Sequence, residues 1–223
     1  MDLSVNKLCS TIEYTRVKGT DTKLDVEKIC DEAKKYNFAA ICVNPFYVER
    51  AHFLLKDSGV EVCTGIGFPL GASTLDVKIK EVQEVKRLGA DALDFVINYS
   101  AIKSGMWDII EKELSAFVKE ATDVVKKVII EACYLTKEEI FRISKMAASY
   151  GVDYIKTSTG MGTSGAKVED IKIIKEAVEG KCKIKASGGI NTLSQVIELL
   201  EAGADRIGTS HGVKILKELQ LKK

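Results

Sequence analysis

The chain of 223 residues is long enough for one or two domains, and its 46% hydrophobic content supplies a core and argues against a disordered chain. Its 33 Lys and Arg nearly cancel its 32 Asp and Glu, which leaves a formal charge of +1. A nucleic acid or an anionic membrane as the main partner would favour a clear basic excess, so the composition argues against both.

The sequence also predicts a cytoplasmic protein without a metal or a cofactor. No apolar run reaches the ~18 residues of a membrane span, and the first residues lack the layout of a signal peptide. His52 and His211 belong to no metal-binding cluster. The cysteines form no C-x-x-C pair, so we expect reduced, mostly buried thiols. They are Cys9, Cys30, Cys42, Cys63, Cys133 and Cys182.

Short β-branched runs recur along the whole chain and alternate with segments of helical periodicity. The runs that we expect to be strands are Ser10–Ile12, Ala39–Val43, Val60–Cys63, Leu93–Ile97, Lys127–Ile130, Tyr154–Lys156, Lys183–Ala186 and Arg206–Gly208. Helical spacing is clearest in residues 77–88 and 140–147. This alternation predicts a parallel sheet wound by right-handed crossovers.

The junctions between helices and strands repeat as well. Gly89, Gly151 and Gly203 each precede a similar x-Asp-x-hydrophobic run, where glycine ends a helix just before a strand begins. Residues 136–139 fit a capping box at a helix start. A doubly wound open sheet would use the same units, but the even repeats without a break favour a single (β/α)8 TIM barrel over residues 1–223.

In such a barrel the active site lies at the carboxyl ends of the strands, where this sequence places Lys156, Lys185 and Asp94. One lysine at a strand end is typically a solvated surface residue, and Asp94 alone would fit a salt bridge. Adjacent parallel strands lie ~4.8 Å apart, so two lysines on neighbouring strands can share one small space and disfavour each other's protonation. A free amine attacks aldehydes and ketones to form an imine, so the three residues predict Schiff-base carbon chemistry with Asp94 moving protons.

Glycine-rich segments follow the last two predicted strands. Residues 187–189 (Ser-Gly-Gly) and 208–210 (Gly-Thr-Ser) place backbone N–H groups just before helices. Such segments bind phosphate, and in these barrels the preferred phosphate site follows strands seven and eight. Each segment alone could be only a turn, but together they predict a small phosphorylated aldehyde or ketone as the substrate.

Several motifs resemble the deoxyribose-phosphate aldolase family, in the family's order along nearly the whole chain. They are residues 42–45 (CVNP), 67–71 (GFPLG), 94–98, 127–131 (KVIIE), 153–160 (DYIKTSTG), 185–190 (KASGGI) and 206–210 (RIGTS). The resemblance implies a metal-free class I aldolase that reversibly cleaves 2-deoxy-D-ribose 5-phosphate to acetaldehyde and D-glyceraldehyde 3-phosphate. It implies that Lys156 forms the imine and that Asp94 and Lys185 transfer protons.

The same resemblance carries expectations for binding and assembly. We expect substrate contacts from Thr157, Gly160, Gly188, Gly189, Gly208 and Ser210. Members of the family are often dimers or tetramers, so we expect a homo-oligomer.

The chain departs from the family pattern at four positions. Glu13 replaces an aspartate near the second lysine, and Ala132 replaces a common threonine. Lys167 stands where a threonine is usual, and His211 where a small residue is usual. We expect His211 to pack rather than to contact phosphate. Two other readings stay open: an imine-forming aldolase for another phosphorylated sugar or a ketone donor, and a non-catalytic phosphate-binding barrel.

Overall fold

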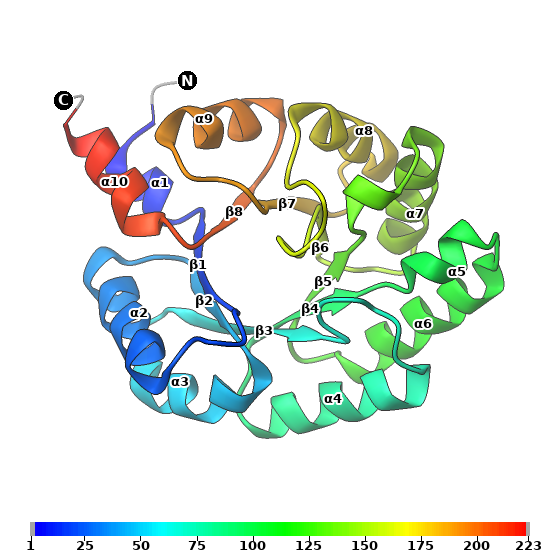
Figure 1. Cartoon of the computed structure of the whole chain (residues 1–223), viewed down its shortest axis with the longest axis horizontal. Helices are drawn as coiled ribbons and strands as arrows, with labels where there is room; N and C mark the ends of the chain where they lie inside the picture. The colour runs from blue at the N-terminus through cyan, green and yellow to red at the C-terminus, as the bar shows by residue number, and fades with distance from the viewer. Residues whose placement is uncertain (1–2, 222–223) are drawn as a thin grey trace.

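The computed structural model describes residues 3–221 and has a closed, all-parallel barrel in the order β1 to β8 (Figure 1). The strands are β1 (Ile12–Arg16), β2 (Ala40–Val43), β3 (Glu61–Ile66), β4 (Ala92–Val96), β5 (Val125–Ile129), β6 (Tyr154–Lys156), β7 (Lys183–Ser187) and β8 (Arg206–Thr209). Because β8 pairs with β1 as well as with β7, the sheet has no free edge. The expected TIM barrel is confirmed.

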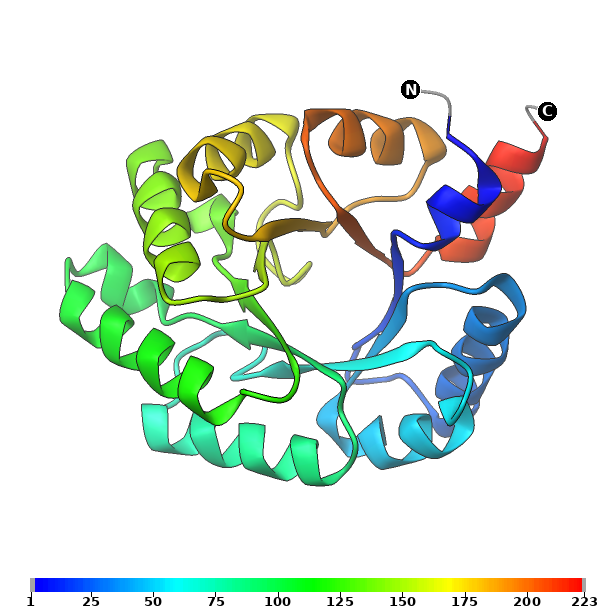
Figure 2. The same ribbon diagram turned by 180° about the vertical axis from the view of Figure 1, so that it is seen from behind.

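The helices form an outer ring around the strands, as both faces of the molecule show (Figures 1 and 2). They are α1 (Val5–Cys9), α2 (Lys23–Tyr36), α3 (Val48–Leu55), α4 (Leu75–Arg87), α5 (Tyr99–Lys103), α6 (Trp107–Glu120), α7 (Lys137–Ser149), α8 (Val168–Val178), α9 (Leu193–Ala202) and α10 (Gly212–Gln220). Two short 3-10 helices, η1 (Pro45–Tyr47) and η2 (Ala132–Tyr134), follow β2 and β5.

The local signals in the sequence are realised at the helix ends. The expected capping box is present at Thr136 and Glu139, at the start of α7. Gly89, Gly151 and Gly203 take positive φ angles of 94°, 85° and 122°, which an L side chain adopts only with strain. Each junction therefore turns the chain sharply from a helix into the next strand.

The first strand lies later in the chain than expected. The sequence predicts a strand at Ser10–Ile12, whereas β1 begins only at Ile12. Ser10 caps the end of α1, and the Thr11 hydroxyl donates to the Leu8 carbonyl. The strand itself carries Glu13 on its inner face, and this charge interrupts the apolar pattern that marks the other strands.

The apolar core lies mainly between the strands and the helix ring. Phe95 of β4, for example, stacks on Phe117 of α6 with ring centroids 4.5 Å apart. Inside the barrel, small residues such as Cys42, Cys63 and Ala92 form a separate apolar cluster. Buried charged side chains occupy much of the remaining barrel interior. Such charges indicate a functional site inside the barrel, toward the carboxyl ends of the strands.

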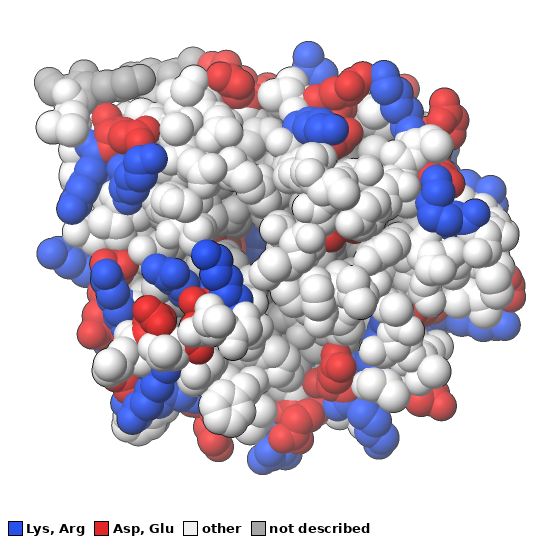
Figure 3. All heavy atoms as spheres, in the orientation of Figure 1, with Lys and Arg blue, Asp and Glu red and all other residues white. Residues whose placement is uncertain are grey.

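The surface carries mixed charges. Figure 3 shows acidic and basic side chains interspersed around the rim of the face drawn in Figure 1, with a hollow near its centre. Over residues 3–221, none of the helices has both the length and the apolar character that crossing a membrane requires.

Candidate active site

A cavity of about 150 Å³ opens at the carboxyl ends of the strands. Its wall includes the predicted residues Asp94, Lys156, Gly188, Gly189 and Ser210. Gly160 and Gly208 also contribute to the wall. The barrel thus brings residues from four different strands and their loops to one hollow.

The Asp94 carboxylate is the centre of the polar cluster. Lys156 Nζ donates to Asp94 Oδ2 at 2.6 Å, and Lys185 Nζ donates to the same oxygen at 2.8 Å. Lys156 and Lys185 are direct register partners in β6 and β7, as the sequence predicted. All three side chains are at least 95% buried. Lys156 borders the cavity, whereas Lys185 lies beneath it.

The charges around Asp94 determine its protonation. Burial alone would raise the pKa of Asp94, but the ammonium groups of Lys156, Lys185 and Lys127 outweigh burial and hold this pKa well below its ordinary value. Burial alone would lower the pKa of Lys185, yet the carboxylates of Asp94 and Glu13 raise it well above the ordinary lysine value. Asp94 is therefore an anion and Lys185 a cation at neutral pH.

Glu13 extends this cluster toward the interior of the barrel. Its carboxylate accepts a hydrogen bond from Lys185 and lies 3.5 Å from Lys127 Nζ and 3.3 Å from Arg206 Nη1. Burial would raise the pKa of Glu13, but the charges of Lys127 and Lys185 lower it overall. The longer side chain at this departure from the family pattern therefore still reaches Lys185.

Lys127 is a further buried lysine of the cluster. It begins the motif at residues 127–131, but no role was predicted for it. It is the register partner of Asp94 on β5, and its Nζ lies 3.4 Å from Asp94 Oδ1 and 3.3 Å from Cys63 Sγ. Its neighbours, the Cys63 thiol first and then Glu13 and Asp94, raise its pKa despite complete burial. A lysine directly before three apolar residues in a predicted barrel strand is the signal that could have identified Lys127 as a buried charge.

The glycines after β7 have conformations suited to backbone recognition. Gly188 and Gly189 have φ angles of 86° and 72°. A Cβ added to Gly165 would lie 2.0 Å from the Gly188 carbonyl oxygen, so the loop after β6 packs directly on the loop after β7. This close approach of two backbones needs glycine and forms one wall of the cavity.

Thr157 lies behind the cavity wall. Its hydroxyl donates to the Ser187 carbonyl at 3.3 Å and accepts from the Ser187 amide at 3.2 Å, so it ties β6 to β7. Thr159, which the sequence reasoning did not select, borders the cavity, and its hydroxyl donates to the Glu131 carboxylate. The contact predicted for Thr157 with the substrate stays a prediction.

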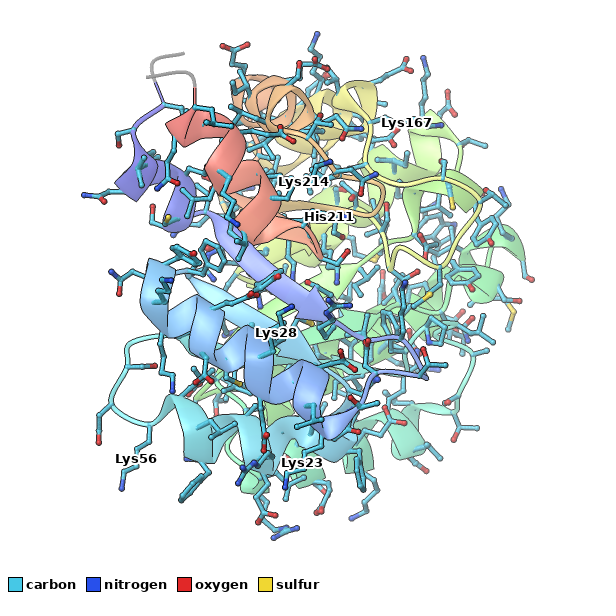
Figure 4. The ribbon with its side chains drawn as sticks, turned by 60° about the vertical axis from the view of Figure 1, so that its left-hand side comes forward. Lys23, Lys28, Lys56, Lys167, His211 and Lys214 are labelled. Carbon is cyan, nitrogen blue, oxygen red and sulfur yellow. The ribbon has the colours of Figure 1, made fainter. Side chains whose placement is uncertain are left out.

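The other departures have different surroundings. Ala132 is buried, and its amide donates to the Thr157 carbonyl at 2.9 Å. Lys167 is exposed at the start of α8, and His211 is exposed at the start of α10, where its Nδ1 lies 3.2 Å from Ser210 Oγ (Figure 4). The expectation that His211 packs is wrong, because the end of β8 points it toward solvent.

Arg16, the last residue of β1, and Lys18, just after that strand, also border the cavity and were not predicted from the sequence. Arg16 Nε is buried without a hydrogen-bond partner, and its Nη1 lies 3.8 Å from Asp21 Oδ1. The strand predicted at Ser10–Ile12 ends before either cation, so the sequence did not place them at the end of a strand.

A closed parallel barrel with buried amines and a carboxylate at its strand ends has the architecture of a TIM-barrel enzyme. The chain belongs to the DeoC/LacD family of aldolases, whose model matches residues 2–218. It is 46% identical over 214 residues to a deoxyribose-phosphate aldolase of a Thermoanaerobacter species, covering 95% of this chain and 96% of that protein. It is also 46% identical over 221 residues to that of Carboxydothermus hydrogenoformans, with 97% of each chain covered.

Solved structures agree with the sequence comparison. The tetrameric deoxyribose phosphate aldolase from Aeropyrum pernix matches with a TM-score of 0.91 and 32% identity, over 99% of this chain and 94% of that one. A structure described as "QR15, an Aldolase" matches with a TM-score of 0.92 and 40% identity, over 99% and 97% of the two chains. The family resemblance drawn from the motifs is confirmed.

Proposed function

We propose that this protein is a class I aldolase that reversibly cleaves 2-deoxy-D-ribose 5-phosphate to acetaldehyde and D-glyceraldehyde 3-phosphate. The observation that carries the proposal is the position of Lys156, whose amine borders the cavity and donates to Asp94 at 2.6 Å beside Lys185. The near-full-length relatives named deoxyribose-phosphate aldolase support the choice of substrate.

The contacts of the buried cluster distinguish Lys156 from the other two lysines, because Lys156 is the one that borders the cavity. Lys127 and Lys185 each pair with both carboxylates, Asp94 and Glu13. In each pair the Nζ lies within 4 Å of a carboxylate oxygen. Arg206 is paired with Glu61 at 2.9 Å as well as with Glu13. Imine formation needs a lysine amine that a substrate can reach, and Lys156 is the lysine of this cluster at the cavity.

The reaction follows from this arrangement. Lys156 adds to the aldehyde of the open-chain sugar, and loss of water leaves an iminium that accepts electrons. Removal of the proton from the hydroxyl two carbons away breaks the carbon–carbon bond and releases D-glyceraldehyde 3-phosphate. The electron pair stays in an enamine, which takes a proton on carbon. Water then hydrolyses the new iminium and frees acetaldehyde and Lys156.

Asp94 and Lys185 are placed to support the proton transfers. Asp94 is ionised and keeps one oxygen, Oδ1, without a hydrogen-bond partner, although the atom is buried. That oxygen can accept a proton directly or through one water molecule. Lys185 remains charged next to it and stabilises the carboxylate, so the pair holds a proton relay beside the imine.

The phosphate end of the substrate fits the glycine-rich loops after β7 and β8, which border the same cavity. Gly188, Gly189 and Ser210 border the cavity just before α9 and α10, where backbone N–H groups and helix dipoles favour an anion. Gly160 and Gly208 border the same cavity. Holding the phosphate fixes the distance from the sugar aldehyde to Lys156, which is how remote binding accelerates a reaction.

The proposal is tested by incubating the purified protein with 2-deoxy-D-ribose 5-phosphate and measuring acetaldehyde with an NADH-dependent alcohol dehydrogenase. We expect turnover by the wild-type protein and none by Lys156→Ala. Lys28→Ala is the matched control, because Lys28 is an exposed lysine on the outer helix α2 (Figure 4). Faster cleavage of another phosphorylated aldehyde would replace the substrate, and a folded wild-type protein without turnover would contradict the proposal.

We also propose that residues 1–223 act as one barrel domain and that the chain forms a dimer or tetramer. The family match over residues 2–218 supports the first statement. The tetrameric Aeropyrum pernix relative supports the second, as do Phe46 and Phe53, whose side chains are 86% and 70% exposed. Sedimentation of a single species at the 24.4 kDa of one chain would contradict self-association.

A further inference from the structure

Two thiols lie side by side under the cavity. Cys42 of β2 and Cys63 of β3 are direct register partners in neighbouring strands, and both are at most 2% exposed. Their Sγ atoms and a carboxylate oxygen of Asp94 all lie within 4.8 Å of one another. Cys42 and Asp94 border the cavity, so a small solute in the cavity reaches two members of this trio directly.

We propose that Cys42, Cys63 and Asp94 form a binding site for a thiophilic divalent cation such as Zn²⁺ or Cd²⁺, and that its occupation inhibits the enzyme. The inhibitory part rests on the function proposed above, whereas the binding part does not. The bound metal would take no part in turnover, since imine chemistry uses no metal, and it would act as an inhibitor.

The donor set suits such a cation. Two thiolates and one carboxylate are three ligands of the kind that zinc takes, and the fourth position faces the cavity, where water can complete a tetrahedron. Two sulfur ligands of a tetrahedral zinc are about 3.8 Å apart, given a Zn–S distance of about 2.3 Å. The present spacing within 4.8 Å therefore needs at most a small contraction.

The surrounding charges also permit binding. Lys127 Nζ lies 3.3 Å from Cys63 Sγ, so a thiolate there would keep an ammonium donor as a neighbour. Binding one divalent cation releases the two thiol protons to water, and the net charge of the buried cluster does not change. The lysines that would repel a cation added to a neutral site are therefore balanced by the two new thiolates.

Inhibition follows from the position of Asp94. A metal on its carboxylate competes with the hydrogen bonds from Lys156 at 2.6 Å and Lys185 at 2.8 Å. The bound cation would also occupy the floor of the cavity and disfavour the positive iminium on Lys156. Both effects act on the proposed imine step, so we expect loss of turnover rather than loss of the fold.

Binding is tested by titrating the full-length reduced protein with Cd²⁺ and following the thiolate-to-metal charge-transfer absorption in the ultraviolet. We expect one Cd²⁺ per chain, and an affinity at least 100-fold lower in Cys63→Ala. Cys30→Ala is the matched control, because Cys30 is a fully buried cysteine on α2, outside the trio. No absorption change in folded protein, or an equal change in Cys63→Ala, would overturn the site.

Inhibition is tested by comparing how much of its own activity each variant loses when Zn²⁺ or Cd²⁺ is added. We expect loss in the wild-type protein and in Cys30→Ala, recovery with a chelator, and resistance in Cys63→Ala. Mg²⁺, which prefers oxygen ligands, should have no effect. Cd²⁺ binding without inhibition by either metal would overturn the inhibitory role. Cd²⁺ binding by a protein without any aldolase activity would uphold the site and refute the proposed function instead.

Discussion

Lys156 and Lys185 stand opposite each other on neighbouring strands and both donate to the same oxygen of Asp94. Asp94 Oδ1, in contrast, has no hydrogen-bond partner and lies 3.4 Å from Lys127 Nζ. One oxygen of the carboxylate thus fixes the two amines, and the other stays free to accept a proton.

Replacing Lys185 by methionine removes the cation between Asp94 and Glu13. We expect kcat to fall by roughly 10²- to 10⁴-fold, the usual range for loss of a positioned proton-transfer group. Lys183→Met is the matched control, because Lys183 lies on the same strand but is exposed at its opposite end. Steady-state kinetics of both variants checks this, and equal losses in the two would argue against a specific role of Lys185.

Glu13→Gln leaves two buried lysines short of one carboxylate. We expect the free energy of unfolding to fall by about 3–5 kcal/mol, as for other broken buried ion pairs. Glu13→Asp restores the family's usual residue and keeps the charge, so it should cost clearly less. Urea unfolding measures both values. A glutamine variant as stable as the aspartate variant would show that the charge of Glu13 does not support the cluster.

The lowered pKa values of Asp94 and Glu13 predict the direction of acid sensitivity. Their ordinary values are 3.8 and 4.5, so the unfolded chain binds protons at a higher pH than the folded chain does. Their contribution to stability is complete above these values and is lost as the pH falls toward the lower folded values. Urea unfolding between about pH 3 and pH 6 should show this loss.

A matched variant separates the cluster from other carboxylates. Glu13→Gln should give a shallower fall of stability with acid than the wild-type protein, because one of the two shifted groups is gone. Identical slopes would mean that the acid sensitivity comes from elsewhere in the chain.

Gly208→Ala should disturb the position of Lys185 in the active site. A Cβ at Gly208 would lie 2.9 Å from the Ser187 Cβ and 3.1 Å from the Lys185 Cε. Such crowding of a packed interior typically costs about 1–3 kcal/mol, and here it would also displace Lys185 from Asp94. Gly19→Ala is the control, because nothing lies within 4 Å of a Cβ there. Unchanged kcat in Gly208→Ala would contradict the close fit around Lys185.

Much of the fold and of the site can be predicted from the sequence, since both depend on periodicity and on strand ends. The helix–strand repeats give the barrel, and the barrel then places Lys156, Lys185 and Asp94 together. The start of β1 escaped prediction because Glu13 faces inward, where a strand of this kind usually carries an apolar residue. The charge is tolerated only because Lys127, Lys185 and Arg206 surround it.

The remaining features depend on register and loop path, which no single segment encodes. Cys42 and Cys63 are 21 positions apart in the chain but are direct partners across two strands. Lys127 likewise meets Asp94 only through pairing of β4 with β5. Arg16 borders the cavity from the end of β1, four residues beyond the end of the strand predicted at Ser10–Ile12.

The most direct test of the central claim is borohydride trapping during incubation with 2-deoxy-D-ribose 5-phosphate, followed by peptide mass mapping. The account predicts a reduced two-carbon adduct on Lys156, which would establish the imine, its position and the cleavage to acetaldehyde together. An adduct on Lys127 or Lys185 instead, or no adduct on folded protein, would contradict it.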